Sequence, residues 1–427
     1  MVDEKTLALE AIRKKLVGKN LSYKEIYAIM DEISHKRLGD ILTTYFAASG
    51  YAKGFSDEEL YYLTKAMVET GEKIDWHEKV VADKHSIGGV PGTRTTMIVI
   101  PIVAAAGFLI PKSSSRAITT PDGTADDMEV LSNVEFSKKQ IEEIVKKTNG
   151  CIVWGGSFGI APADDVMIHV ESPLLFESYD KIIVSILAKK IAFGSTHVVI
   201  DMPYGKTVKV HRHADAEVLR DKFLYVAERF GVKMTVLISQ TDEPAGRGIG
   251  PVLETREALR VLEQTDNRPL DLEKRALNLA GALLDLCLED SSETKQREIK
   301  EQFGTGYQWA KHVLQQGNAL QKMKDIIAAQ GGDPTVTAEK LTQKLGKHTH
   351  AVVATHTDRV HTIDSHNLTV IAKILGAPTH KGSGIYLDRK IGERFEKGQT
   401  LFTLISESEY NLKEALDSLI HFPIMRV

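Results

Sequence analysis

The chain has 427 residues, 42% of them hydrophobic and 26% charged, which is enough for two or three globular domains. Its net charge of -4 at pH 7 lacks the basic field of nucleic-acid-binding proteins, so we expect no nucleic-acid partner. The apolar run over residues 97–110 is too short to span a bilayer, so we expect no membrane partner either. Two cysteines, Cys151 and Cys287, and a charged N-terminus predict a cytoplasmic protein.

Helical patterns fill the first 75 residues. A Ser followed three residues later by Glu is the capping-box pattern, and it precedes two stretches that we predict as helices, over 23–34 and 60–70. The two pairs are Ser22 with Glu25 and Ser56 with Glu59. We therefore predict a small all-α domain over 1–75, which also takes helices from about 161–193.

Two polar segments then flank an apolar helix. The first, residues 83–92, reads DKHSIGGVPG, and the second, residues 111–129, reads PKSSSRAITTPDGTADDME. Glycines let the backbone approach a ligand, hydroxyl groups donate hydrogen bonds, and each segment carries a cationic side chain. This chemistry predicts a phosphate site built from two loops, and ordinary turns before helices are the alternative.

Strand and helix patterns alternate in the middle of the chain. Strands are predicted over 151–154 and 166–170, and helices over 138–148 and 180–193. A strand–helix–strand unit over 197–202, 214–230 and 233–239 favours a mostly parallel sheet. This part of the chain is therefore predicted as a large α/β domain over 76–335.

Helical stretches near 252–263, 269–289 and 292–316 complete that domain. A Gly- and Pro-containing boundary over 331–347 follows, then a β-rich region over 351–405 and a helix over 411–419. We predict a C-terminal α+β domain over 340–427. The predicted fold class is α/β, with the small all-α domain beside the large α/β domain.

The two polar segments also carry longer motifs. The first reads Asp-Lys-His-Ser-x-Gly-Gly at 83–89, and in the second Ser114 and Arg116 precede Gly-Thr-x-Asp-x-x-Glu at 123–129. This resembles the signature of the thymidine and pyrimidine nucleoside phosphorylase family, and Ser-Ser-Arg-Ala-Ile-Thr most resembles its AMP phosphorylase branch. The similarity extends over about residues 5–425.

The resemblance implies a nucleoside phosphorylase/phosphoribosyltransferase-like fold and a homodimer formed through the helical domain. It implies a pentosyltransferase that reversibly converts a (deoxy)nucleoside such as thymidine and phosphate to free base and (deoxy)ribose 1-phosphate. The alternative is conversion of AMP and phosphate to adenine and ribose 1,5-bisphosphate. AMP phosphorylases carry a further domain before this point, and the sequence leaves open whether this protein lacks it or the chain is truncated.

The resemblance also assigns binding roles to single residues. Thr95 is an alternative to Thr96 in binding phosphate, because the first loop is one residue longer here than in pyrimidine phosphorylases. The phosphate-binding residues are expected to be Lys84, Ser86, Thr95, Thr96, Ser114 and Thr124. The nucleoside- or nucleotide-binding residues are expected to be Gly89, Ser115, Arg116, Ala117, Ile118, Thr119, Thr120, Ser185, Lys189 and Lys209.

Three residues are candidates for catalysis, namely His85, Glu177 and Lys189. His85 follows the phosphate lysine and can protonate or hydrogen-bond a leaving base, or it packs beside a turn. Ser185 and Lys189 are four apart on a predicted helix, so they share a face. They match the base-binding motif Ser-Ile-Leu-Ala-Lys-Lys of the family, although without the resemblance Lys189 and Lys190 read as a solvated helix end.

Two departures from the family pattern concern the base. Glu177 stands where AMP phosphorylases have an aspartate that protonates the leaving base, and it can act as a general acid if burial raises its pKa. Otherwise it is a surface carboxylate. The base-binding arginine of the pyrimidine enzymes is missing from residues 167–171, where His169 is a weak substitute.

No organic cofactor is expected, since inorganic phosphate is the co-substrate. In relatives the region around Glu254 can help to bind a monovalent cation, and this is left open. No metal site is predicted. His211 with His213 and His348 with His350 have the spacing of metal pairs, but no third ligand is close in sequence, so solvated histidines are the simpler interpretation.

Two rival functions are kept. Phosphoribosyl transfer, as in anthranilate phosphoribosyltransferases, needs a magnesium-diphosphate site and a Lys-His-Gly-Asn segment, whereas Lys84-His85-Ser86 matches the phosphorylases. The other rival is a phosphate- or nucleotide-binding protein that retained the fold and lost the chemistry, because the base-binding arginine is missing and Glu177 replaces aspartate.

Overall fold

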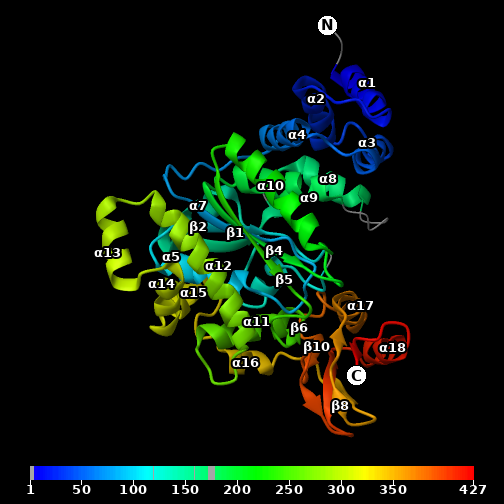
Figure 1. Ribbon diagram of the computed structural model, residues 1–427, viewed down its shortest axis with the longest axis vertical. Coiled ribbons are helices and arrows are strands. Elements are labelled where there is room, and N and C mark those ends of the chain that lie inside the picture. Colours follow the sequence, from blue (N-terminus) through cyan, green and yellow to red (C-terminus); the bar gives the residue numbers. More distant parts are fainter. Residues whose placement is uncertain (1–3, 119, 158, 172–177) are drawn as a thin grey trace. The chain divides into compact units, whose positions relative to one another are not determined.

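The computed structural model describes residues 4–118, 120–157, 159–171 and 178–427, which fold into two compact units (Figure 1). The first, here called the helical unit, comprises Met1–Asp83, Gly155–Val198 and Glu217–Thr235. The second, here called the α/β unit, comprises Lys84–Trp154, Val199–Ala216 and Val236–Val427. No helix of the described residues has both the length and the apolar character needed to cross a membrane.

Two of the helices in the helical unit start at the predicted capping boxes. The side chains of Ser22 and Ser56 accept the backbone N–H of Glu25 and Glu59, and each glutamate binds back to its serine N–H. Glu59 also forms a buried ion pair with Lys15, whose Nζ lies 2.8 Å from Oε1. The helices are α1 (Glu4–Leu16), α2 (Tyr23–Ser34), α3 (Asp40–Lys53), α4 (Asp57–Glu69), α8 (Pro162–Glu171), α9 (Tyr179–Ala192) and most of α10 (His213–Arg229).

The predicted strand over 166–170 is wrong, because these residues belong to α8. Pro162 is the first residue of that helix, where its missing N–H costs no hydrogen bond. Asp164 and Asp165 lie in the first turn, where negative charge is favoured. A five-residue apolar run is too short for its periodicity to distinguish a strand from a helix.

The strand–helix–strand prediction for residues 197–239 is confirmed. β1 (Ala82–Ser86), β4 (His197–Tyr204) and β5 (Lys233–Gln240) form a sheet in the order β1-β4-β5, and α10 connects β4 to β5. β2 (Ile110–Ser114) pairs in parallel with β3 (Gly150–Trp154), and between β1 and β2 lies α5 (Thr96–Ala105), nearly all of which is buried. The first polar segment therefore starts as a strand rather than a loop.

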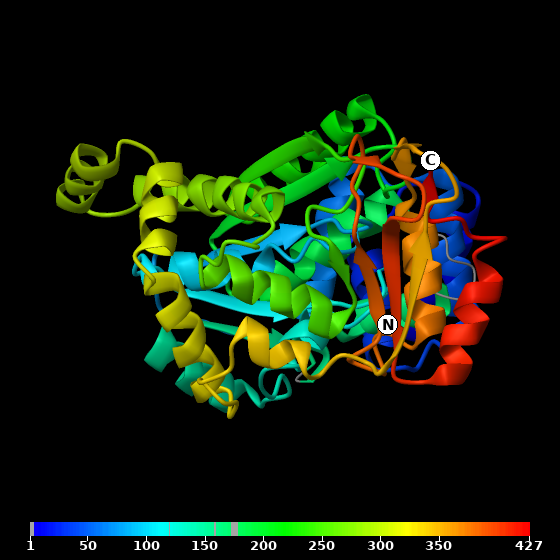
Figure 2. The same cartoon turned by 90° about the horizontal axis from the view of Figure 1, so that it is seen from below.

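Helices make up the next part of the α/β unit. The helix predicted over 292–316 is two helices, because α13 ends at Gly304, which adopts a φ of 75°. α13 has no buried residue and lies at the outer edge of the unit (Figures 1 and 2). The helices are α6 (Thr124–Met128), α7 (Lys138–Thr148), α11 (Pro251–Leu262), α12 (Leu270–Glu289), α13 (Glu293–Phe303), α14 (Gly306–Gln315), α15 (Asn318–Ala329) and α16 (Ala338–Thr342).

The C-terminal part has an antiparallel sheet with the strand order β6-β10-β12-β7. Its strands are β6 (Gly248–Ile249), β10 (Gly384–Leu387), β12 (Thr400–Ser406) and β7 (His348–Val353). α17 (Ser365–Leu375) and α18 (Glu409–Ser418) pack on this sheet over one apolar core that includes Ile249, Leu368, Ile385 and Phe402. Short pairs are formed by β8 (Asp358–Arg359) with β11 (Arg394–Phe395) and by β9 (Thr362–Ile363) with β13 (Met425–Arg426). The fold class is confirmed as α/β.

Candidate functional site

Four of the predicted phosphate-binding residues meet at the end of β1. Alternation along the strand places Lys84 and Ser86 on one face, and the loop returns Thr95 and Thr96 to them at the start of α5. Nζ of Lys84, which is buried, lies 2.5 Å from Oγ of Ser86, 2.7 Å from Oγ1 of Thr95 and 3.2 Å from Oγ1 of Thr96. Both Thr95 and Thr96 therefore contact the lysine, and which of them binds phosphate stays a prediction.

This arrangement has the chemistry of an anion site. An ammonium group has three N–H donors and no acceptor, so each hydroxyl that accepts from Lys84 keeps its own hydrogen to donate elsewhere. A phosphate oxygen near Lys84 would meet one positive charge and hydroxyl donors together. The structure thus groups Lys84, Ser86, Thr95 and Thr96 in a way that favours the predicted role, which stays a prediction.

Two residues that the sequence analysis missed hold Ser86. Its hydroxyl donates to Oδ2 of Asp201 over 2.7 Å, and Asp201 is bound by Arg275, with 2.7 Å between Nη2 and Oδ1. Arg275 also donates to Oγ1 of Thr241. Asp201 is buried within the apolar strand β4, and an acidic residue in such a run was the available signal, because a buried carboxylate needs a partner.

The glycine-rich loop after β1 adjoins Lys209. Gly88 and Gly89 have φ values of 95° and 83°, which residues with a side chain rarely adopt. A Cβ at Gly89 would lie 3.0 Å from both the backbone N and Cγ of Lys209. The structure therefore brings together Gly89 and Lys209, two of the residues predicted to contact the nucleotide.

The second polar segment is built around Asp126. Oδ2 of Asp126 accepts the backbone N–H groups of Ala117 and Gly123, at 2.7 and 2.8 Å. A Cβ at Gly123 would approach the carbonyl oxygen of Ser115 to 2.3 Å, so only glycine fits this turn. Ser115 itself lies just after β2, and its carbonyl accepts from the Ala125 N–H. The loop is thus closed on itself before Thr124 begins α6.

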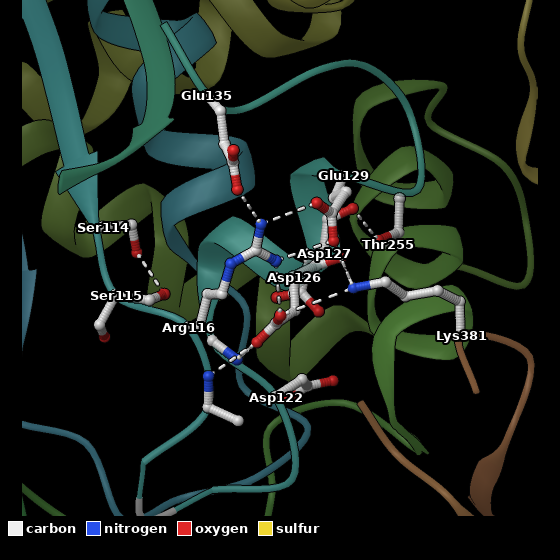
Figure 3. A network of polar contacts seen from close by, with 12 residues as sticks. Ser114, Ser115, Arg116, Asp122, Asp126, Asp127, Glu129, Glu135, Thr255 and Lys381 are labelled. Atoms are coloured by element: carbon white, nitrogen blue, oxygen red, sulfur yellow. Dashed lines mark hydrogen bonds and ion pairs between the residues drawn. The ribbon is translucent and has the colours of Figure 1, made fainter. Parts of the chain in front are cut away.

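Arg116 is held by acidic side chains of its own segment and its neighbours. Its guanidinium binds Glu129 at 2.8 Å and Glu135 at 3.0 Å (Figure 3), and it lies 5.0 Å from the ring of Trp154. Lys381, from the C-terminal part, reaches Glu129 over 2.7 Å. These contacts make Arg116 a scaffold residue of the loop, and its contact with a nucleotide stays a prediction.

The remaining residues of the second segment carry weaker information. Ser114 ends β2, and its hydroxyl donates to the Ser115 carbonyl over 3.4 Å. Ile118 is 46% exposed and its carbonyl accepts from Lys373, while the Thr120 hydroxyl donates to the Asp122 carbonyl. Thr119 lies outside the described residues, as does the catalytic candidate Glu177.

The candidate base-binding residues lie in the helical unit. Ser185 and Lys189 share one face of α9, as predicted, and both reach Oδ2 of Asp164 over 2.7 Å. Asp164 is fully buried on α8 and was missed by the sequence analysis. Although burial acts in the opposite direction, the charges of Lys189 and Lys181 lower the pKa of Asp164, so the carboxylate stays ionised.

The neighbouring groups keep Lys189 charged. Burial lowers its pKa, but Asp164 and then Asp165 outweigh this effect and raise it. Lys190 points elsewhere, since its Nζ lies 2.6 Å from Oδ2 of Asp83. A charged donor at Lys189 next to the Ser185 hydroxyl can hydrogen-bond the carbonyl and ring nitrogen acceptors of a nucleobase.

The histidine candidates are placed separately. His85 is half-buried on β1, and alternation puts it on the face opposite Lys84 and Ser86. His169 lies on α8 and lines a cavity of about 500 Å³ together with Pro162, Asp165 and Val166. The catalytic role of His85 and the base-binding role of His169 stay predictions.

Within the described residues, the candidate metal-ligand groups do not include the histidine pairs at 211/213 and 348/350. The group found consists of Asp122, Asp127 and Glu254. However, Nη2 of Arg94 lies 2.6 Å from Oδ1 of Asp122 and 3.0 Å from Oε2 of Glu254. Glu254 and Asp122 are already paired with a guanidinium, so these residues do not fit such a cation.

Three protein-family models match successive parts of the chain. Residues 9–71 match the helical bundle domain and residues 78–320 the a/b domain of a glycosyl transferase family. Residues 359–421 match the C-terminal domain of pyrimidine nucleoside phosphorylases.

The relatives carry two different names. An AMP phosphorylase of Thermofilum pendens is 43% identical over 95% of this chain and 76% of its own length. A protein of Legionella pneumophila (strain Corby), provisionally named thymidine phosphorylase, is 42% identical over 96% and 76%. Anthranilate phosphoribosyltransferase from Thermus thermophilus has a similar fold, with a TM-score of 0.62, 18% identity, and coverage of 75% of this chain and 99% of its own.

Proposed function

Because the chain belongs to the glycosyl transferase family of these helical bundle and a/b domains, and within it to the nucleoside and AMP phosphorylases, we propose that it catalyses reversible phosphorolysis of a (deoxy)nucleoside such as thymidine. The observation that carries the proposal is the contact of buried Lys84 with three hydroxyl groups. Inorganic phosphate is the proposed co-substrate, and this chemistry requires no organic cofactor.

The proposed reaction is one displacement at the anomeric carbon. A phosphate oxygen forms a bond to C1′ while the bond from C1′ to the base nitrogen breaks. The electron pair leaves with the base, and the proton that hydrogen phosphate gives up balances the one that the base takes up. Lys84, Thr95 and Thr96 bind the phosphate anion and orient it for attack. Lys189 and Ser185 hydrogen-bond the base, and the ammonium group stabilises the negative charge that develops on it. Asp164 holds both side chains in position.

AMP is the second candidate substrate, and one contact favours it. Lys209 lies against Gly89, so a cationic side chain is close to a glycine-rich loop that can approach a phosphate group. The positive charge of Lys209 could pair with a 5′-phosphate, whereas a nucleoside has no such group. The products would then be adenine and ribose 1,5-bisphosphate.

The test is the release of free base in phosphate buffer and in phosphate-free buffer, with thymidine, uridine, cytidine and AMP assayed in parallel by chromatography. We expect release only with phosphate. Turnover of thymidine supports the nucleoside reaction, and turnover of AMP alone assigns the chain to the nucleotide reaction. If no substrate releases base in either buffer, the proposed reaction is refuted.

We also propose a cytoplasmic homodimer formed through α3. Ile41 and Tyr45 are four residues apart on this helix, so they share a face, and their side chains are 75% and 53% exposed. Light scattering should give twice the chain mass, and replacing both residues by glutamate should give the monomer mass. A wild-type protein of single chain mass at micromolar concentration would contradict the dimer.

A further inference from the structure

A buried cluster of charges links the two polar segments. Arg94, two residues after the first segment, contacts Asp122 and Asp127 of the second segment and Glu254 at the start of α11. Glu254 also accepts the backbone N–H of Gly92 at 2.9 Å. One guanidinium therefore joins three parts of the chain that are 28 to 160 residues apart.

The cluster is buried and acidic. The side chains of the three carboxylates are 0% exposed and that of Arg94 is 12% exposed. Burial, together with the mutual repulsion of the carboxylates, raises the pKa of Asp122 and of Glu254 to about 8, although Arg94 opposes this. Several carboxyl oxygens, including Oδ2 of Asp122 and Oδ1 of Asp127, have no hydrogen-bond donor among the described residues. Arg94 is the counter-ion that favours the ionised form of these carboxyl groups.

The position of Arg94 in the chain connects this cluster to the phosphate site. Thr95 and Thr96 follow it directly, and both contact Lys84. On the other side, Asp122 and Asp127 bracket Gly123 and Thr124, the start of α6. Thr255 of α11 donates to the carbonyl of Asp127, which fixes that end (Figure 3). A shift of Arg94 would therefore move the predicted phosphate-binding residues Thr95, Thr96 and Thr124.

We infer that Arg94 is a positioning residue of the phosphate site. It is also the built-in counter-ion of this carboxylate cluster, in the region where relatives can bind a monovalent cation. The inference rests on the proposed phosphorolysis. It has two consequences. The wild-type enzyme binds phosphate without any requirement for potassium or sodium. Removal of the guanidinium weakens phosphate binding and makes it responsive to an added cation.

The test compares wild type, Arg94→Ala and the control Arg268→Ala. Arg268 is also ion-paired, to Glu273 at 2.6 Å, but contacts no predicted site residue among those described. Phosphate is supplied as the tetramethylammonium salt, and the phosphate KM, kcat and the phosphate-dependent rise in melting temperature are measured. Guanidinium or potassium chloride is then added at about 20 mM, with tetramethylammonium chloride as the ionic-strength control, because a ligand that binds only the folded state stabilises it by mass action.

We expect Arg94→Ala to raise the phosphate KM by at least about tenfold, with a smaller effect on kcat, because binding geometry is lost rather than the reacting groups. Added guanidinium or potassium should reverse at least about a third of the increase in log KM for phosphate, as expected when a cation site is refilled. Wild type and Arg268→Ala should show neither the loss nor the recovery.

Three results would overturn the inference: a cation requirement in wild type, an unchanged phosphate KM in Arg94→Ala, or a loss that no cation restores. If Arg94→Ala does not fold, Arg94→Lys, which keeps the charge but cannot reach three carboxylates, should show a raised phosphate KM, and the wild-type cation test stands by itself. Failure of the proposed function looks different, since wild type would then release no base while phosphate still raised its melting temperature.

Discussion

Lys84→Met is expected to lower kcat/KM for phosphate by about 10³-fold. The substitution removes the ammonium group that contacts three hydroxyls, and charge stabilisation in a buried site is worth several kcal/mol. The variant should fold, because methionine retains most of the buried apolar stem. The measurement is steady-state phosphorolysis at varied phosphate concentration.

Lys295→Met is the matched control for this prediction. Lys295 is also desolvated, with a lowered pKa, and packs 3.9 Å from the ring centre of Phe108, but it belongs to no predicted site. It should keep wild-type kinetics. If Lys84→Met retained more than about a tenth of wild-type kcat/KM, a difference of less than about 1.4 kcal/mol, Lys84 would not be the phosphate-binding lysine.

Lys189→Met is expected to lower kcat/KM for the nucleoside by about 10²–10³-fold and to leave the phosphate KM close to that of wild type, because the lost hydrogen bond serves the base. It should also lower the free energy of unfolding by about 1–3 kcal/mol, since Asp164 remains buried without its charged partner.

The double variant Asp164→Asn with Lys189→Met separates these two effects. It removes the unpaired charge, so stability should return while activity stays low, and a double-mutant cycle measures the coupling. Chemical denaturation and steady-state kinetics on all four proteins provide the data. Recovery of activity together with stability would show that Lys189 acts only through the fold of the helical unit.

The sequence by itself determined the elements whose signals are local. The capping boxes at Ser22 and Ser56 start α2 and α4, because the partner lies only three residues away and no distant contact is needed. The faces of helices followed from spacing in the same way, which put Ser185 and Lys189 together on α9. Where the local signal was weak, as in residues 166–170, the prediction failed and the residues are helical.

Motifs likewise identified which residue types to expect in the site but not how they are held. The lysine and the hydroxyls that gather around it were recognised from a run of 14 residues, 83–96. Their partners Asp201 and Arg275 lie 115 and more residues away, and no periodicity connects them. The resemblance likewise left room for a cation near Glu254 and did not indicate that Arg94 stands there.

Only the tertiary structure decided these charge pairings. A buried carboxylate must have a partner, but any of the 54 lysines and arginines satisfies that requirement until folding brings one of them near. Arg94 meets Glu254 at a separation of 160 residues because α5 and α11 pack together, and that packing depends on apolar surfaces along both helices. The sequence therefore determined the local elements and the chemistry available, and the long-range packing selected which charges neutralise one another.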